Sequence, residues 1–384
     1  MNSTSKIYLD KSALENNFKF LRRIFGKNRI ISSVVKGNAY GHGIREYVPL
    51  AENCGINHFS VFSSKEAAIV KNCCKSDSTI LIMGMISTDE LEWAITNDIE
   101  FFVFEIERLL NALTVAKKLN RKVKVHIEVE TGMNRTGFDL EDWQDVCDIL
   151  SSNSEFIEFT GLCTHFAGAE SIANYARVLK QKKNFQKAIK FFEKNELKAK
   201  LHHTACSAAS IRYPNTRMDL VRIGILQYGF WPSKETFIEY IKNKKVKTDP
   251  LKRVISWKSK IMSVKDIKEG EFVGYGTTYL AHKDITIGIV PVGYAHGFSR
   301  SLSNTGRVLI KGKRVAVIGI VNMNLMVIDI SDIDDVKIGE KVIMIGSQGD
   351  MEVTVASFSE LSNQLNYELL TRLPHDIPRC ILEK

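Results

Sequence analysis

The sequence predicts an α/β fold in which an N-terminal (β/α)8 barrel, over residues 1–240, precedes a mainly β domain over residues 241–384. The first observation is that apolar runs alternate with segments of helical period through the first two-thirds of the chain. The second is a change after about residue 240, where short β-like runs are separated by glycine turns. The third is the Lys-rich stretch 242–253, which contains Pro250 and is typical of a joint between domains.

Eight apolar or β-branched runs can each supply one strand of the barrel. Their spacing, with helical segments between them, favours parallel strands joined by crossover helices. Eight such units that close on themselves form a barrel of about 250 residues, in which the chemistry lies at the C-terminal ends of the strands. The runs are 7–10, 31–36, 59–62, 79–84, 101–105, 122–130, 159–165 and 200–205.

Helices are predicted between these runs, most clearly at 12–25, 88–98 and 106–119. Each repeats its apolar residues at the period of an amphipathic helix. Thr88 is a suitable N-cap for the second helix. The apolar stripes are formed by Leu14, Phe18, Leu21 and Ile24, by Leu91, Ala94 and Ile95, and by Leu109, Leu110, Leu113 and Ala116.

The second domain is expected to be mainly antiparallel. Its apolar runs are short, and Gly turns such as Lys311-Gly312-Lys313 separate them. No internal repeat is found along the chain. The predicted β runs are 253–264, 285–294, 307–321, 325–330 and 340–346.

Composition excludes several protein classes. Hydrophobic residues make up 44% and charged residues 25% of the 384 residues, which is typical of a globular protein and not of a disordered or collagen-like chain. No apolar run approaches the ~18 residues of a membrane span. The N-terminus has no apolar segment typical of a signal peptide. The seven cysteines are odd in number and include no C-x-x-C, so we expect a reduced, cytoplasmic protein.

The net charge of +9 does not indicate a nucleic-acid or membrane partner. Most of the excess is Lys spread over predicted helix faces, for example at 179–200. The densest cluster, 242–253, has no interleaved aromatic residues that could stack on bases. We therefore expect no nucleic-acid or membrane partner.

The segment SVVKGNAYGHG, residues 33–43, has the sharpest chemical signature. An apolar strand ends there in Lys36, and a turn rich in Gly and Asn follows. A lone Lys at a strand end is usually a solvated charge. At the C-terminal mouth of a barrel, however, a Lys whose pKa is lowered by its neighbours can form a Schiff base with an aldehyde. Gly41 and Gly43 allow the backbone to approach a ligand closely.

KGNAYGHG closely resembles the pyridoxal-phosphate motif of the alanine racemase family, and the resemblance continues in register along nearly the whole chain. That family has a barrel followed by a β domain, which agrees with the fold predicted above. The further matching segments are VHIEVETGMNRTGF (125–138), LCTHFAGAE (162–170), HTACSAAS (203–210), DLVRIGILQYGF (219–230), SWKSKIMSV (256–264), FVGYGTTY (272–279), VGYAHGFSR (292–300), IGIVNMNLMVIDIS (318–331) and NYELLTRLPHDIPR (366–379).

The resemblance implies a racemase that interconverts L-alanine and D-alanine with pyridoxal 5'-phosphate and supplies D-alanine for peptidoglycan. Lys36 would hold the cofactor and then act as one of two catalytic bases. Arg222 would face the pyridine nitrogen and, because an arginine keeps its proton, would leave that nitrogen unprotonated. The alternative for Arg222 is a structural ion pair with Asp219. No metal is implied.

The resemblance also implies the rest of the cofactor site. Hydroxyls and backbone N–H groups at a loop-to-helix turn suit a phosphate. A histidine would pack beside the pyridine ring, and a second would orient Arg222. By position these residues are Ser207, Gly224, Ile225 and Tyr40 at the phosphate, His165 beside the ring and His203 against the arginine.

Tyr275 matches the second catalytic base of the family. Racemisation needs a base on each face of the planar carbanion, and a free phenol has a pKa of ~10, so the site must favour the phenolate. The family supplies this tyrosine from the partner subunit, which implies a homodimer with shared active sites. Tyr294, Arg300 and Met323 match residues on the substrate side, and Met323 would act through its backbone N–H.

Glu128 is the departure from the family with a chemical consequence. It stands where the family commonly has a carbamylated lysine, whose anionic end steers the following arginine, here Arg135. Arg135 would bind the cofactor's phenolic oxygen and the substrate carboxylate. We expect Arg135 to lower the pKa of Glu128. The other departures bear on substrate breadth and turnover: Glu170, Cys206, His296, Ile320, Asn324 and His375.

Three other functions use the same barrel. A decarboxylase of this kind would place a carboxylate against the pyridine nitrogen, which Arg222 argues against. A single-domain cofactor carrier would lack the β domain and with it Tyr275. The sequence does not distinguish an active enzyme from a non-catalytic binding protein that descends from one.

Overall fold

The computed structural model describes residues 3–355 and 366–383, and its chain forms two compact units. One unit is a barrel made from residues 14–36 and 48–252. The other is rich in β-structure and combines residues 1–13, 37–47 and 253–384. The predicted boundary at residue 240 stays a prediction, because the β-rich unit draws on three separate stretches of the chain.

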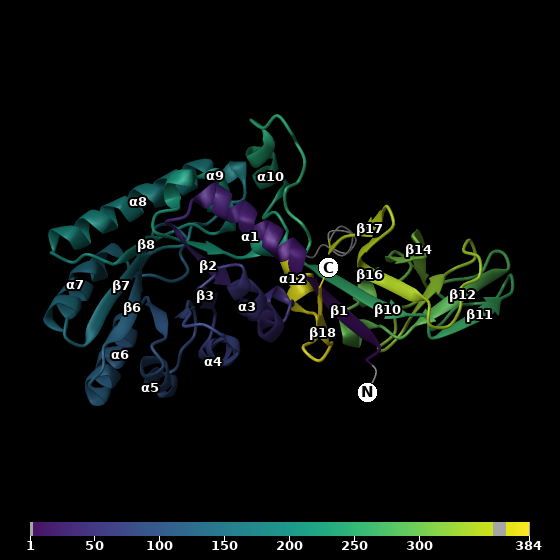
Figure 1. Ribbon diagram of the computed structural model, residues 1–384, viewed down its shortest axis with the longest axis horizontal. Helices are drawn as coiled ribbons and strands as arrows, with labels where there is room; N and C mark the ends of the chain where they lie inside the picture. Colours follow the sequence, from purple (N-terminus) through teal and green to yellow (C-terminus); the bar gives the residue numbers. More distant parts are fainter. Residues whose placement is uncertain (1–2, 356–365, 384) are drawn as a thin grey trace. The chain divides into compact units, whose positions relative to one another are not determined.

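The barrel unit contains eight parallel strands in the order β8-β7-β6-β5-β4-β3-β2-β9. Figure 1 labels β8, β7, β6, β3 and β2 among them. The ring is nearly closed, since the N–H groups of Asp219 and Arg222 donate to the carbonyls of His202 and Ala205, at 3.1 and 2.9 Å. The fold class is as predicted. The strands are β2 (Ile30–Val34), β3 (His58–Val61), β4 (Thr79–Ile82), β5 (Glu100–Val103), β6 (Val123–Glu128), β7 (Ile157–Cys163), β8 (Leu201–His203) and β9 (Leu220–Ile223).

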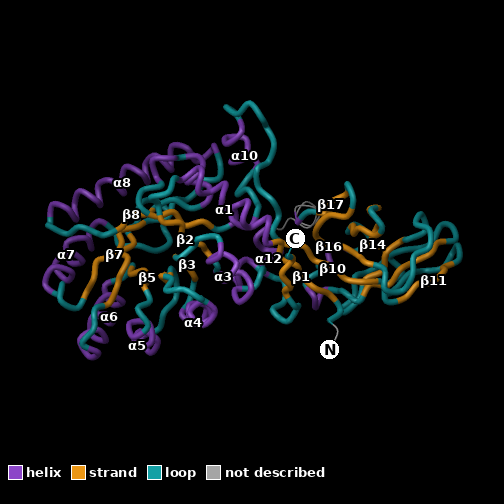
Figure 2. Tube along the Cα trace, in the orientation of Figure 1, coloured by secondary structure: helices purple, strands orange, loops and turns teal. Residues whose placement is uncertain are grey.

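Helices cover the outside of the strands, as Figure 2 shows for α4 to α8. Helix α5 begins one residue earlier than expected, because Ser87 and Glu90 form a capping box. The helices are α1 (Lys11–Phe25), α3 (Ile44–Asn53), α4 (Ser64–Cys73), α5 (Thr88–Thr96), α6 (Ile106–Leu119), α7 (Trp143–Ser152), α8 (Tyr175–Lys194), α9 (Ser207–Arg212) and α10 (Lys234–Ile241).

The first predicted barrel strand was assigned to the wrong unit. Residues 7–10 lie in β1 (Ser5–Asp10), which pairs with β10 and β18 of the β-rich unit. Residues on β1 alternate between buried and more exposed positions, whereas β3 and β5 are buried throughout. This period of two is typical of a strand with one solvated face. The eighth barrel strand is instead β9, which carries Arg222 and is not among the eight apolar runs predicted as strands.

The β-rich unit is one mainly antiparallel sheet in the order β11-β12-β15-β14-β13-β16-β10-β1-β18, with β17 paired to β16. A cluster of Ile and Val residues, including Ile285, Ile287 and Ile318, forms part of its core. The elements are β10 (Ile255–Lys260), β11 (Ser263–Ile267), β12 (Ile285–Val290), β13 (Arg307–Ile310), β14 (Lys313–Ile318), β15 (Met326–Asp329), β16 (Lys341–Gln348), β17 (Met351–Val353), α12 (Asn366–Thr371) and β18 (Arg379–Leu382).

Candidate active site

Lys36 follows β2 and begins a turn of left-handed backbone. Gly37, Asn38, Ala39 and Tyr40 all have positive φ, of 62°, 54°, 53° and 51°. Each non-glycine residue in this conformation costs roughly 1–2 kcal/mol because its Cβ crowds the backbone. Strain of this kind persists only where the surroundings hold it in place, and it is concentrated at functional sites.

Hydrogen bonds within the β-rich unit hold this turn. The side-chain oxygen of Asn38 accepts from the Ile44 N–H at 3.0 Å. The buried His42 ring donates from Nδ1 to the carbonyls of Ala39 and Tyr40, both at 3.0 Å. Burial lowers the pKa of His42 to about 3, so the ring is neutral at neutral pH. A Cβ at Gly41, where φ is +79°, would lie 1.9 Å from the Leu370 carbonyl oxygen, so only glycine fits there.

The electrostatic surroundings of Lys36 favour a neutral amine. Desolvation and the guanidinium groups of Arg135 and Arg222 lower its pKa, and the carboxylate of Glu66 opposes them. A lysine must lose its proton to act as a nucleophile or a base. The direction of this shift agrees with the role expected of Lys36.

Arg222 is buried inside the barrel on β9, with 4% of its surface exposed. Its Nη1 donates to Nδ1 and to the carbonyl oxygen of His203, the latter at 3.1 Å. Its Nη2 donates to the Thr164 carbonyl at 2.7 Å. Asp219 instead accepts from the His202 N–H at 2.7 Å. No ion pair between Arg222 and Asp219 occurs among the described residues.

Two short helices begin beside each other at the expected phosphate position. Ser207 is the first residue of α9, and Ile225 is the first of a 3-10 turn, Ile225–Tyr228. The Ser207 hydroxyl accepts from the Gly224 N–H at 3.0 Å. Cys206 is the residue before α9 and makes no side-chain cap hydrogen bond. First-turn N–H groups and a hydroxyl are the donors that an anion prefers.

His165 follows β7 and carries no charge at neutral pH. Burial, followed by the charges of Arg222, Arg135 and Lys36, lowers its pKa to about 3. Arg222, Arg135 and Lys36 therefore all lie close enough to His165 to act on its pKa. A neutral imidazole among cations can stack on a ring without adding further positive charge.

The predicted direction of the pKa shift of Glu128 was wrong. Burial raises the pKa of this carboxyl, which is 3% exposed, and outweighs a hydrogen bond from Thr136 and the charges of Arg222 and Arg135. The arginine was expected to lower it, but sequence does not show that the carboxyl at the end of β6 is removed from water. Arg135 itself is exposed.

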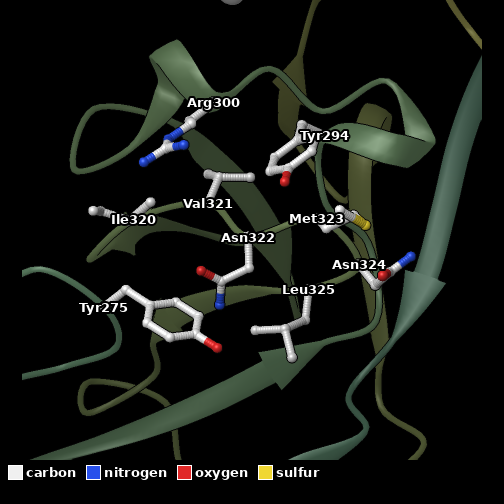
Figure 3. A pocket seen from close by; sticks show the side chains of 9 residues that line it. All are labelled: Tyr275, Tyr294, Arg300, Ile320, Val321, Asn322, Met323, Asn324 and Leu325. Carbon is white, nitrogen blue, oxygen red and sulfur yellow. The ribbon is translucent and has the colours of Figure 1, made fainter.

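The other predicted site residues line a pocket of about 430 Å³ in the β-rich unit (Figure 3). Tyr275 is 73% exposed and Met323 is 56% exposed. Figure 3 places Asn322, which sequence reasoning missed, between Tyr275 and Tyr294. The lining residues are Tyr275, Tyr294, Arg300, Ile320, Val321, Asn322, Met323, Asn324 and Leu325.

Close backbone packing shapes this pocket. Tyr294 and Ala295 donate their N–H groups to the carbonyls of Asn322 and Met323, at 3.0 and 2.9 Å. A Cβ at Gly293 would lie 2.1 Å from the Asn322 carbonyl oxygen. The ring Nδ1 of His296, one of the departures, accepts from the Gly293 N–H at 3.2 Å. His296 therefore supports the segment that carries Tyr294.

Two further kinds of feature are absent from the described residues. Over residues 3–355 and 366–383, no group of three or more His, Cys, Asp or Glu side chains is arranged to hold a metal ion. Within the same described residues, no helix combines the length and the apolar character needed to cross a membrane.

Comparison with known proteins identifies the family. Residues 9–232 match the family model "Alanine racemase, N-terminal domain", and residues 254–381 match "Alanine racemase, C-terminal domain". The alanine racemase of Leptospira interrogans is 33% identical, over 99% of this chain and 96% of its own length. That of Clostridium perfringens is 34% identical, over 97% and 93%.

Solved structures agree with the sequence matches. The alanine racemase of Clostridium difficile superposes with a TM-score of 0.91 at 27% identity, covering 100% of this chain and 96% of that one. The Bacillus anthracis alanine racemase, described with bound L-Ala-P, gives 0.90 at 29% identity and the same coverage. The chain belongs to the alanine racemase family, isomerases that interconvert the two forms of alanine and serve peptidoglycan synthesis.

Proposed function

We propose that this chain interconverts L-alanine and D-alanine with pyridoxal 5'-phosphate, and that Lys36 and Tyr275 are its two acid–base catalysts. The observation that carries the proposal is the arrangement around Lys36. Its amine has a lowered pKa, follows a buried strand, begins a strained turn and lies within the field of the fixed Arg222 guanidinium.

The residues of the barrel fit this cofactor. Ser207 and the N–H groups that begin the turn at Ile225 suit its phosphate, and Tyr40 adds a phenol there by resemblance. The neutral His165 suits the side of its ring. When bound, pyridoxal phosphate supplies an aldehyde for an amine and a ring that withdraws electrons from the substrate carbon. An alanine racemase of Bartonella henselae, alike in fold with a TM-score of 0.84, is described with covalently bound pyridoxal phosphate.

Arg222 restricts the chemistry to proton exchange. An arginine can only donate, so Arg222 would leave the ring nitrogen of bound pyridoxal phosphate without a proton. A cofactor held in this way would be a weaker electron sink than one paired with a carboxylate. Arg222 would thereby favour return of the proton to the substrate carbon over decarboxylation and other side reactions.

Two bases exchange the proton at the substrate carbon. Lys36 takes or returns it on one face, and the partner subunit's Tyr275 does so on the other. The high exposure of Tyr275 in the β-rich unit supports a role toward a second copy of the chain. The assembly is then a homodimer with shared active sites.

The remaining residues bind and admit the substrate. By resemblance, Arg135 would hold the substrate carboxylate, and the charge of Glu128, which interacts with that of Arg135, would steer the arginine. Met323 adds its backbone N–H, while Tyr294 and Arg300 line the approach. We expect a cytoplasmic enzyme whose partners are an amino acid and its own second copy, without nucleic acid or membrane.

The cofactor assignment is tested by reduction. We expect purified protein to absorb light through bound pyridoxal phosphate, and borohydride to fix the label on Lys36, because its amine is the one with the lowered pKa in this site. Peptide mapping identifies the labelled residue. Lys36→Ala should lose both label and racemisation, and Lys65→Ala, an exposed lysine on α4, should keep both. Label on another lysine would refute the assignment.

The shared site is tested by mixing two inactive proteins, Lys36→Ala and Tyr275→Phe. In a mixed dimer one site carries both changes and the other carries neither, so random exchange should restore about a quarter of the parental activity. Mass spectrometry of differently tagged subunits verifies the exchange. Proven exchange without recovered activity would show that each subunit uses its own Tyr275.

The role of Glu128 is tested with Glu128→Gln. Loss of the charged partner of Arg135 should lower kcat/KM about tenfold or more, since such a contact is worth ~1.5–3 kcal/mol. Because burial raises the pKa of Glu128, its charge disappears at a higher pH than that of an ordinary carboxyl as the solution is acidified. The parent should therefore lose activity on the acid side, and the variant should lack that step in its pH profile.

Glu158→Gln, on the neighbouring strand β7 and paired with Lys200, is the matched control and should behave as the parent. A kcat/KM for Glu128→Gln within twofold of the parent, or a parent that depends on added bicarbonate, would contradict this role.

A further inference from the structure

A chain of polar side chains runs through the interior of the barrel behind Arg222. Arg222 Nη1 faces Nδ1 of His203. His203 Nε2 lies 2.8 Å from Nδ1 of His126 on β6, and His126 Nε2 lies 2.8 Å from Oε2 of Glu100 on β5. His126 and His203 have no exposed surface, and Glu100 is 8% exposed. Sequence reasoning had identified neither His126 nor Glu100.

The hydrogen bonds of this chain can run in only one direction. An arginine N–H always donates, so Nδ1 of His203 must accept and its proton must be on Nε2. That proton is then donated to Nδ1 of His126, which places the second ring's proton on Nε2. His126 therefore donates to Glu100, a carboxylate that only accepts. Both rings are neutral, and each has one fixed tautomer.

The strands are shaped around His126. The pairing of β6 with β7 is irregular between Val125 and His126, where a bulge brings Gly161 opposite the histidine. A Cβ at Gly161 would lie 2.1 Å from Nδ1 of His126, so a larger residue would displace the ring. The Phe102 ring stacks on His126 at 6.2 Å and lies 5.7 Å from the Arg222 guanidinium carbon.

The charges at the two ends agree with this direction. Burial by itself would raise the pKa of Glu100, but the hydrogen bond from His126, followed by the charges that His126, His58 and Lys124 carry when protonated, lowers it overall. Burial, followed by the charge of Arg222, lowers the pKa of His203 far below its usual range. The chain thus joins a buried cation to a buried anion through two neutral rings.

We propose that Glu100 and His126 are positioning residues for Arg222, because they fix His203 in the tautomer that accepts the arginine's N–H. Without the Glu100 acceptor, His126 could take its other tautomer and donate to His203. Its proton would then confront that of His203, and His203 could no longer accept from Arg222 without moving. The effect of this on catalysis rests on the proposed function, whereas the direction of the chain does not.

Neutron diffraction from protein crystals exchanged into heavy water tests the direction itself. We expect deuterium on Nε2 of both His126 and His203 and none on Nδ1 of either ring. Deuterium on Nδ1 of either ring would overturn the proposal. This measurement needs no variant, so it decides the matter even if substitutions in the barrel prevent folding.

Variants of Glu100 test whether the fixed orientation of Arg222 matters for catalysis. Glu100→Leu should lower kcat about tenfold, leave KM within about twofold and shift the absorption of bound pyridoxal phosphate, because Arg222 loses its fixed orientation. Glu100→Gln should recover most of kcat, since its amide oxygen can still accept from His126. Glu158→Leu makes the same change on β7, outside the chain of hydrogen bonds, and should match the parent.

The outcomes separate this proposal from the proposed function. Parental kcat and absorption in Glu100→Leu, or an equal loss in Glu158→Leu, would refute a positioning role. A protein that has the expected deuterium positions but racemises no amino acid would refute the function while leaving the hydrogen-bond direction intact. An active racemase with deuterium on Nδ1 of His126 would refute the hydrogen-bond direction while leaving the proposed function intact.

Discussion

The positive charge of Arg222 is buried inside the barrel, and several features of the structure depend on how it is accommodated. A charge removed from water is tolerated only when its donors are satisfied and a counter-charge is near. The carbonyls of Thr164 and His203 satisfy donors directly, and Glu100 provides an anion beyond two imidazole rings. The same charge helps to lower the pKa values of both Lys36 and His165, and at a pKa of about 3 the His165 ring is neutral.

The second constraint is the left-handed turn after Lys36. Three consecutive non-glycine residues, Asn38 to Tyr40, adopt a conformation that costs roughly 1–2 kcal/mol each. The carbonyl of Gly41 accepts from Arg379 at 3.0 Å, and its Cα lies against the backbone of Leu370. The far end of the sequence therefore maintains the geometry next to the lysine. This explains why residues 37–47 belong to the β-rich unit although they interrupt the barrel in sequence.

The sequence predicted the fold class because strand–helix alternation and the later change to short β runs are properties of local pattern. Sequence reasoning assigned residues 7–10 to the barrel because this strand is followed by a helix, as every strand of the barrel was expected to be. The alternation of buried and exposed residues that places the strand in the β-rich unit is only a few residues long. The prediction from sequence also missed β9 as a strand, since Arg222 interrupts its apolar run. Sequence reasoning likewise gave the pKa shift of Glu128 the wrong sign, because a motif shows neighbours but not the loss of water around a carboxyl.

Side chains that meet across strands gave no pattern in the sequence itself. The contact of His203 with Arg222 was predicted from the family resemblance, but Glu100 and His126 lie on two other strands, and no spacing along the chain relates them to it. Buried histidines in strands are also commonly ordinary core residues, so neither His126 nor Glu100 gave a signal. Asn322 gave no sequence signal either, because only the fold places it between Tyr275 and Tyr294 (Figure 3). The residues found in advance were those carried by motifs that lie close together in sequence.

In the proposed function, the guanidinium of Arg222, which can only donate, would keep the ring nitrogen of bound pyridoxal phosphate unprotonated. The most direct measurement is the ¹⁵N NMR shift of that nitrogen in labelled pyridoxal phosphate bound to the protein. The account predicts the shift of an unprotonated pyridine nitrogen that accepts a hydrogen bond at neutral pH. The shift of a protonated pyridinium nitrogen would contradict it.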